Sequence, residues 1–84
     1  MKKIGVISAI LEAPEESQSD FNRIISDYKE LVKGRMGIPF DDENISVVTI
    51  TVVGDINDIN SLTGKLGNLP HVQVKTSISK RDII

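Results

Sequence analysis

Two segments of this chain carry apolar side chains on both faces of a predicted β-strand, and this feature limits the possible folds more than any other. In ISVVTITVVGD, residues 45–55, alternate positions place Val48, Ile50 and Val52 on one face. The opposite face is also largely apolar and carries Ile45, Val47, Thr49, Thr51 and Val53. Such a strand belongs in the middle of a sheet that is covered on both sides. Because the chain has only 84 residues, we expect one domain, residues 1–84, with a single core.

The second segment of this kind runs from Lys2 to Glu12 and is followed by a predicted helix. Pro14 and the acidic residues after it are typical of a helix N-terminus, and Gly34 is expected to end the helix. The strand predicted at residues 2–12 would place Ile7, Ala9 and Leu11 on one face and Ile4, Val6 and Ile10 on the other. The apolar stripe of the helix comprises Phe21, Ile24, Ile25, Tyr28, Leu31 and Val32.

The next three elements are shorter. Residues Met36–Phe40 predict a strand at the edge of a sheet, because Pro39 has no N–H to donate to a neighbouring strand. Residues Asp41–Asn44 predict the turn into the strand at 45–55. Asp55 is expected to cap a second helix, and Gly67 lies just past its end. The apolar stripe of this helix comprises Ile56, Ile59, Leu62 and Leu66.

The last predicted strand, His71–Ser79, alternates regularly between apolar and polar positions. The complete order is βαββαβ, which predicts an α+β, ferredoxin-like (ACT-like) sandwich. In that fold the antiparallel sheet has the strand order 4-1-3-2, and both helices cover one face. The pattern agrees with this order, because the two segments with two apolar faces become the central strands and the segment that contains Pro39 becomes an edge.

One face of the predicted sheet lacks a cover from this chain. On it lie Val47, Thr49, Thr51 and Val53, and we expect these residues to form the interface of a homo-oligomer, a dimer or a tetramer. Six-residue strands make a face of about 400 Å², and two stacked faces about 800 Å², below the roughly 1,000 Å² of a stable interface. Edge pairing or loop contacts would then have to add area. The alternative is a monomer whose threonine-rich face meets water.

Composition removes several functions that this fold often serves. The chain has no cysteine and one histidine, so we expect no metal site and no cofactor. Serine nucleophiles lack a nearby base, and the strands that would stack RNA bases have no aromatic residues, so we expect no enzyme and no RNA-recognition motif. A net charge of -2 argues against direct nucleic-acid binding. No segment predicts a signal peptide or a membrane span, so we expect a cytoplasmic protein.

The topology is expected to separate the charges into two ends. Basic residues should gather at one end, namely Lys2, Lys3, Lys33, Arg35, Lys80 and Arg81. Acidic residues should gather at the other end near His71, namely Glu12, Glu15, Glu16, Asp41, Asp42 and Glu43. These ends are either docking surfaces or ordinary solvated loops. A cation site that includes His71 and an anion site at Arg35 or Lys65 remain alternatives.

Two glycine-containing motifs carry a resemblance to a known family. They are GRMGIP, residues 34–39, and LTGKLG, residues 62–67, the second followed by HVQVKTSISK. Together with IGVISAI near the start, they resemble the small stand-alone iron-only hydrogenase system regulators along essentially the whole chain. The motif positions singled out as binding candidates are Gly34, Arg35, Met36, Gly37, Gly64, Lys65 and Gly67. Their structural alternative is that the glycines end helices, relieve an edge strand or permit close helix packing, and that Met36 fills the core.

The resemblance implies a regulatory protein related to the ACT-like C-terminal domain of the nickel-responsive repressor. Two functions stay open from the residues: an oligomeric domain that senses an unknown small ligand or docks a protein partner, and a ligand-independent assembly or adaptor module. The ligands of ACT domains and of the nickel repressor are both disfavoured. The loop LEAPEES lacks the glycine that lets an amino acid approach the backbone in ACT domains, and the chain lacks the cysteine and the several histidines of the nickel site.

Overall fold

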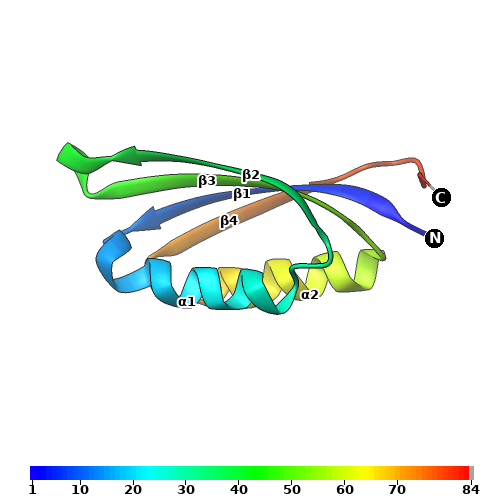
Figure 1. Cartoon of the computed structure of the whole chain (residues 1–84), viewed down its shortest axis with the longest axis horizontal. Coiled ribbons are helices and arrows are strands. Elements are labelled where there is room, and N and C mark those ends of the chain that lie inside the picture. The colour runs from blue at the N-terminus through cyan, green and yellow to red at the C-terminus, as the bar shows by residue number, and fades with distance from the viewer. Residues whose placement is uncertain (84) are drawn as a thin grey trace.

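The computed structural model describes residues 1–83 and contains four strands and two long helices (Figure 1). In chain order the elements are β1 Lys3–Glu12, α1 Pro14–Asp27, β2 Val32–Phe40, the 3-10 helix η1 Asp41–Glu43, β3 Ile45–Gly54, α2 Ile56–Gly67 and β4 Val72–Ile78. The order is therefore βαββαβ, as the sequence pattern predicts.

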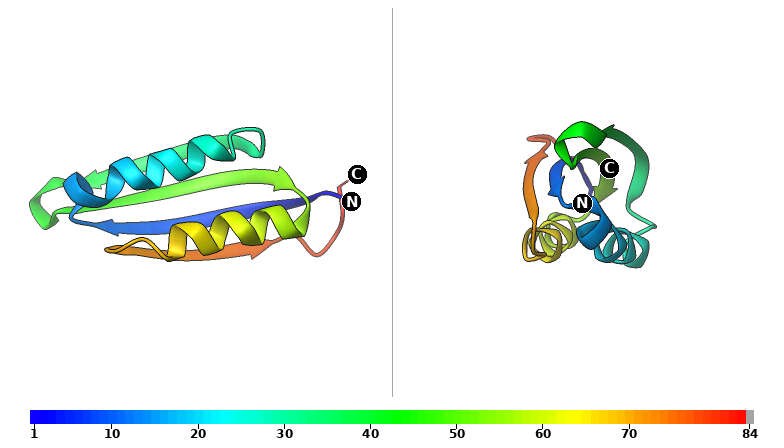
Figure 2. Two further views of the ribbon diagram at one scale, coloured as in Figure 1. Left: turned by 90° about the horizontal axis from the view of Figure 1, so that it is seen from below. Right: turned by 90° about the vertical axis from the view of Figure 1, so that its left-hand side faces the viewer.

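The strands form one antiparallel sheet in the order β2-β3-β1-β4. Both helices lie on one side of this sheet, as Figures 1 and 2 show from three directions. The predicted ferredoxin-like arrangement is confirmed, with β1 and β3 in the middle and the segment that contains Pro39 at an edge. The face of the sheet opposite the helices is called the open face below.

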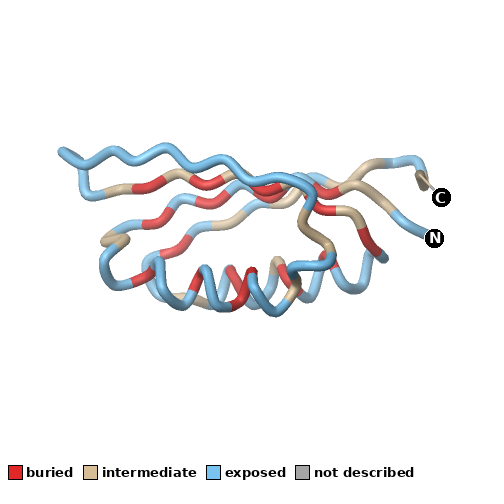
Figure 3. The backbone as a smooth tube through the Cα atoms, in the orientation of Figure 1, coloured by how far each residue is buried: buried red, intermediate tan, exposed pale blue. Residues whose placement is uncertain are grey.

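The core lies between the sheet and the two helices (Figure 3). Burial alternates along β1 and β3, so every second side chain points into this layer. α1 contributes Phe21, and α2 contributes three fully buried side chains at helical spacing. The largest fully buried side chains are Phe21, Ile7, Leu11, Ile50, Ile59, Leu62, Leu66, Val48 and Val52. The predicted helix-facing positions of β3 are thus correct, and on β1 the face that carries Ile7, Ala9 and Leu11 is the one that meets the helices.

Two glycines that the sequence pattern did not single out allow close packing in this layer. A Cβ atom on Gly5 would lie 3.0 Å from Cγ2 of Val52 and 3.1 Å from Cγ2 of Ile59. A Cβ atom on Gly54 would lie 3.1 Å from Cγ of Leu31. Glycine at these positions lets α2 and the loop after α1 approach the sheet.

The predicted end of the first helix is wrong. α1 ends at Asp27, Tyr28 is its C-cap, and a turn leads into β2 at Val32. Gly34 therefore lies inside β2, next to an irregularity in the pairing between Val32 and Gly34. The helix ends early because residues 31 and 32 form hydrogen bonds with the central strand β3 instead. The Val53 N–H donates to the Leu31 carbonyl, and Val32 pairs with Val52. Local helical spacing could not reveal this tertiary competition.

Four smaller expectations also need correction. Asp55 occupies the N-cap of α2 but makes no side-chain capping hydrogen bond. Ile56 is exposed at the start of α2 and does not join the buried stripe, and Gly67 is the last residue of the helix and does not follow it. Met36, the proposed core residue, is the most exposed of the large apolar side chains in the strands.

Candidate functional site: the open face of the sheet

Residues from all four strands alternate onto the open face of the sheet. The pairing register places them in rows that cross the strands. One row joins Ile38, Val47, Ile10 and Gln73, and the next joins Met36, Thr49, Ser8 and Lys75. The four residues predicted for an interface, Val47, Thr49, Thr51 and Val53, all lie on this face and are half-buried.

Apolar side chains exposed to solvent are concentrated on the open face. Within residues 1–83, seven large apolar side chains are exposed, and five of them belong to this face. These five are between 39% and 60% exposed and comprise Val6, Ile10, Met36, Ile38 and Phe40. A concentration of this kind is typical of an interaction surface, because single exposed apolar residues are normally scattered.

The edge strand β2 supplies three of these side chains, of which the sequence motifs had singled out only Met36. Met36, Ile38 and Phe40 are spaced two residues apart, so they share one face of the strand. That spacing is the signal that could have identified them. Pro39 predicts the edge position of the strand, but an edge position does not determine which of its side chains face solvent.

The open face is not flat. A hollow of about 440 Å³ lies over the central strands and β4 and is lined by Ser8, Ile10, Val47, Thr49, Gln73 and Lys75, among others. The three exposed β2 side chains stand next to it across the sheet. A shallow apolar depression thus lies beside a row of projecting apolar side chains.

Arg35, a predicted binding candidate, lies on the helix-facing side of β2. Its Nη2 donates to Oδ1 of Asn22 at 2.6 Å, and its guanidinium carbon lies 5.8 Å from the centre of the Phe21 ring. Arg35 pairs with Ile50 near the middle of the sheet, so it does not belong to the basic end, contrary to expectation. Its contacts connect the edge strand to α1.

Lys65, the other basic candidate, makes a different connection. Its ammonium lies 5.1 Å from the centre of the Tyr28 ring, and the Tyr28 hydroxyl lies 3.3 Å from the Ser61 hydroxyl. Lys65, and to a smaller extent Ser61, lowers the pKa of the Tyr28 phenol, while the same contact raises the pKa of Lys65. Because Arg35 contacts Phe21 within α1 and Lys65 contacts Tyr28 at the C-cap of that helix, the structure does not bring the two cations together in one anion site.

The four motif glycines are exposed and have open space beside them. A Cβ atom on Gly34, Gly37, Gly64 or Gly67 would meet no atom within 4 Å apart from its own chain neighbours and helix backbone, and none of these residues has a positive φ. The suggestion that Gly64 permits close helix packing is therefore wrong. The fold of a single chain does not require glycine at these positions, in contrast to Gly5 and Gly54.

Replacing Gly64 with alanine is expected to stabilise the monomer. Gly64 is exposed inside α2, where alanine is more favourable than glycine by about 0.5–1 kcal/mol. Urea denaturation should show this increase in the free energy of unfolding. Gly5→Val is the control, because its side chain would overlap Val52 and Ile59 and should cost about 1–3 kcal/mol. A loss of stability in Gly64→Ala would contradict the open environment described here.

The acidic end is assembled as predicted around the start of β4. The Glu12 N–H donates to the His71 carbonyl, which places the histidine next to the end of β1 and the start of α1.

Among residues 1–83, no group of three or more side chains of the metal-binding types lies close enough together to hold an ion. Neither helix of the described chain has the length and apolar character needed to cross a membrane.

Solved structures of other proteins share this architecture. The uncharacterized protein TM1266 from Thermotoga maritima is 28% identical, with a TM-score of 0.91, over 95% of this chain and 100% of its own. The C-terminal domain of MgtC from Mycobacterium tuberculosis is 15% identical (TM-score 0.61), with 94% of this chain and 89% of that domain covered. SnoaB, a cofactor-independent oxygenase from Streptomyces nogalater, is 14% identical (TM-score 0.59), with 100% and 97% covered. At these identities the last two show a common fold alone.

Sequence comparison gives the family. No curated protein matches the chain. The profile of the TM1266-like family, described as "Iron-only hydrogenase system regulator, putative", matches residues 3–76, which include both glycine-containing motifs and all of the sheet except the end of β4. The chain therefore belongs to the TM1266-like family.

Proposed function

We propose that this protein is a non-enzymatic regulatory domain of the iron-only hydrogenase system that works as a homo-oligomer, with two copies pairing through their open faces. The observation that carries the proposal is the concentration of five exposed apolar side chains on that face. The family description supports a regulatory role. Regulation would pass through a small ligand or a protein partner, since the net charge of -2 does not favour binding to nucleic acid.

The size of the open face is compatible with a stable pair. β1 and β3 have ten residues each, β2 has nine and β4 has seven. At about 3.3 Å per residue and about 4.8 Å per strand, the face covers roughly 600 Å². Two stacked faces would bury roughly 1,200 Å², which reaches the lower end of specific interfaces. Each strand is longer than the six residues used in the sequence-based area estimate. The two stacked faces therefore bury more area, and edge pairing or loop contacts have less area to add.

The relief of the open face supports pairing between identical copies. In a two-fold dimer the same patch meets itself, so a projection on one copy must meet a depression on the other. The row Met36, Ile38 and Phe40 projects from the edge strand, and the hollow around Ile10 and Val47 lies next to it. Two copies related by a two-fold axis across the face would each insert the β2 row into the partner's hollow.

The pairing is tested by sedimentation of the unmodified protein at micromolar concentration. A pair of 9.2 kDa chains should sediment at twice that mass, and a tetramer at four times. A single 9.2 kDa species up to high micromolar concentration would overturn the proposal. The relation to the nickel repressor's ligand domain stays a prediction and is independent of this result.

The second candidate function is a ligand-independent adaptor that uses the same paired form. A thermal-shift screen with amines, amino acids, nucleotides and divalent metals distinguishes the two. A ligand that binds only the folded state raises the melting temperature by mass action, whereas an adaptor should not respond to any of them. Binding by a small molecule favours the ligand-sensing function.

A further inference from the structure

The two edges of the sheet differ in how well they can accept another strand. β2 forms one edge and β4 the other, because each pairs with a single neighbour, β3 or β1 (Figure 2). An edge strand presents unpaired backbone N–H and C=O groups, and proteins usually block it with proline, a bulge or charged side chains. In this chain the β2 edge carries a proline and an irregular register, whereas the β4 edge carries one charged residue.

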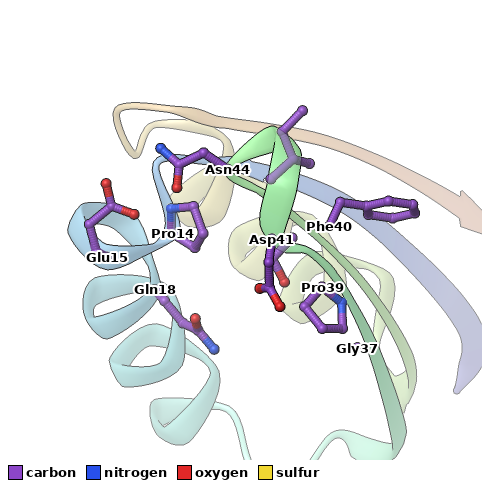
Figure 4. A pocket seen from close by; sticks show the side chains of 10 residues that line it. Pro14, Glu15, Gln18, Gly37, Pro39, Phe40, Asp41 and Asn44 are labelled. Carbon is purple, nitrogen blue, oxygen red and sulfur yellow. The ribbon is translucent and has the colours of Figure 1, made fainter.

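The β2 edge is poorly suited to an added strand. Its pairing with β3 is irregular between Val32 and Gly34, and Pro39 has no N–H to donate. Figure 4 shows Pro39 on β2, across a hollow from Gln18 of α1. A strand added along β2 would therefore lose a hydrogen bond at Pro39 and would meet an uneven backbone at the other end of β2.

The strand β4 has neither interruption. Val72–Ile78 contains no proline or glycine and pairs with β1 in one continuous register. The Glu12 N–H donates to the His71 carbonyl, and the Ser79 N–H donates to the Ile4 carbonyl, so both ends of β4 are fixed to β1. Backbone groups alternate in direction along an antiparallel strand. His71, Ser79 and the odd-numbered positions between them therefore direct these groups to β1, and the even-numbered positions direct them outward.

The outward backbone groups of β4 form a regular row. They are the N–H and C=O groups of Val72, Val74, Thr76 and Ile78. Within residues 1–83 no other strand pairs with them, and no backbone group of a turn or loop bonds to them. A strand that pairs antiparallel to β4 would bind the whole row and would add one strand to the sheet.

Lys75 determines which strand fits this row. It is the only charged residue of β4, it is exposed, and it lies on the open face in the row with Ser8 and Thr49. Its own backbone groups face β1, so toward an added strand it occupies a non-hydrogen-bonded pair, in which opposite side chains lie closest. The residue opposite Lys75 would therefore contact its side chain. An acidic residue is favoured there, and a basic residue is disfavoured.

A second copy of β4 is a poor occupant for the same reason. Two copies related by a two-fold axis would pair β4 with itself, and the register that joins the whole row places residue 75 opposite its own equivalent. Lys75 would then face another lysine, and like charges directly opposite are destabilising. A shift by two residues avoids this contact but loses some of the hydrogen bonds. The edge thus disfavours self-pairing and favours a strand of opposite charge.

The helix-facing side chains of β4 determine the alternate residues of the added strand. Val72 is buried, and Val74 and Ile78 are half-buried beside the core. The Thr76 hydroxyl lies 2.8 Å from the hydroxyl of Thr63 on α2, so its hydrogen bond is made within the chain. Residues of an added strand that face the helices would lie next to these side chains, where apolar β-branched residues fit.

We propose that the β4 edge binds an extended segment of another protein. The segment adds to the sheet antiparallel to β4, carries an aspartate or glutamate opposite Lys75, and directs β-branched residues toward the helices. This inference rests on the partner-docking form of the proposed function, for which it names the surface and the chemistry of the partner. Pairing of open faces uses side chains that project from the sheet, whereas the added strand binds backbone groups that lie in its plane.

The test uses the acetylated and amidated peptide Val-Thr-Val-Glu-Val-Thr-Val, whose glutamate lies opposite Lys75 when it overlaps β4 fully. Amide hydrogen exchange of the labelled full chain is followed by NMR as peptide is added. Exchange at Val74 and Thr76 should slow on the order of tenfold, whereas Arg35 and Gly37 on the β2 edge should not change. Unchanged exchange at Val74 and Thr76 would overturn the inference. Slow exchange at both before peptide is added would also overturn it, because a second copy would then occupy the edge.

An exchange of charges tests the contact with Lys75. A peptide with lysine in place of the glutamate should bind the unmodified chain about threefold or more weakly. In Lys75→Glu the preference should reverse. Lys33→Glu makes the same change at an exposed lysine of β2 and should keep the preference of the unmodified chain. Equal binding of both peptides to the unmodified chain, or a reversal in Lys33→Glu, would mean that the contact is not at Lys75 and would overturn the proposal.

Methylated peptides test the backbone hydrogen bonds. In the proposed complex the valine N–H groups of the peptide point to β4, and the threonine N–H groups point away from it. N-methylation of the two central valines should therefore abolish binding, whereas N-methylation of the two threonines should preserve it. Binding that survives methylation of the valines would contradict strand addition. Sedimentation separates this inference from the open-face pairing: paired chains that do not bind the peptide refute the docking alone, and monomeric chains that bind it refute the pairing alone.

Discussion

Replacing Ile10 with lysine is expected to leave a monomer at concentrations where the unmodified chain pairs. Ile10 lies on the central strand β1, 40% exposed on the open face, and it lines the hollow beside Val47. In the proposed pair its position is covered by the second copy. An unpaired buried charge costs about 3–5 kcal/mol, so the dissociation constant should rise at least ~100-fold. Sedimentation at a series of concentrations measures the change.

The chain offers a matched control for this substitution. Ile56 is the same residue type and is 44% exposed, but it lies at the start of α2 and away from the open face. Ile56→Lys should therefore pair like the unmodified protein. If both variants pair normally, the open face is not the interface. If both become monomeric, added charge itself prevents association and the substitution does not locate the contact.

Replacing Phe21 with alanine is expected to remove a large part of the stability of the fold. Phe21 is fully buried between α1 and the sheet, and its ring also lies beneath the Arg35 guanidinium. Truncation of a buried phenylalanine typically costs about 3–5 kcal/mol, out of the roughly 5–15 kcal/mol of a small domain. The melting temperature should fall on the order of 10–40 °C. Thermal denaturation followed by circular dichroism measures this loss.

The second phenylalanine provides the comparison, because the chain has only two. Phe40 is 47% exposed on the open face, so Phe40→Ala should cost the monomer less than about 1 kcal/mol. Measured at low protein concentration, its melting temperature should stay close to that of the unmodified chain. At high concentration it should fall below it, because a pair that loses apolar contact area gains less from association. A large loss at low concentration would place Phe40 in the core, contrary to the structure.

The motif that identifies the family has a structural meaning for one residue and not for the others. Arg35 connects the edge strand to α1 through Asn22 and the Phe21 ring. Gly34, Gly37, Gly64 and Gly67 have open space where a Cβ atom would lie.

The sequence alone determined the layers of this protein. Alternation along residues 2–12 and 45–55 identified the two central strands, and Pro39 identified an edge. These are local properties, because side-chain direction in a strand depends only on its position along the strand. The same reasoning placed Val47, Thr49, Thr51 and Val53 on a face without helices.

The tertiary structure decided everything that depends on which segments meet. The helical spacing of apolar residues predicts a first helix that continues beyond Asp27. In the structure the helix ends at Asp27, because Val32 pairs with Val52 in the sheet. The pairing register of β2 with β3 places Met36, Ile38 and Phe40 on the open face beside Thr49, Val47 and Ile45. No local pattern encodes such contacts, because they are chosen by the free energy of the whole packed domain and not by the conformational preference of any one segment.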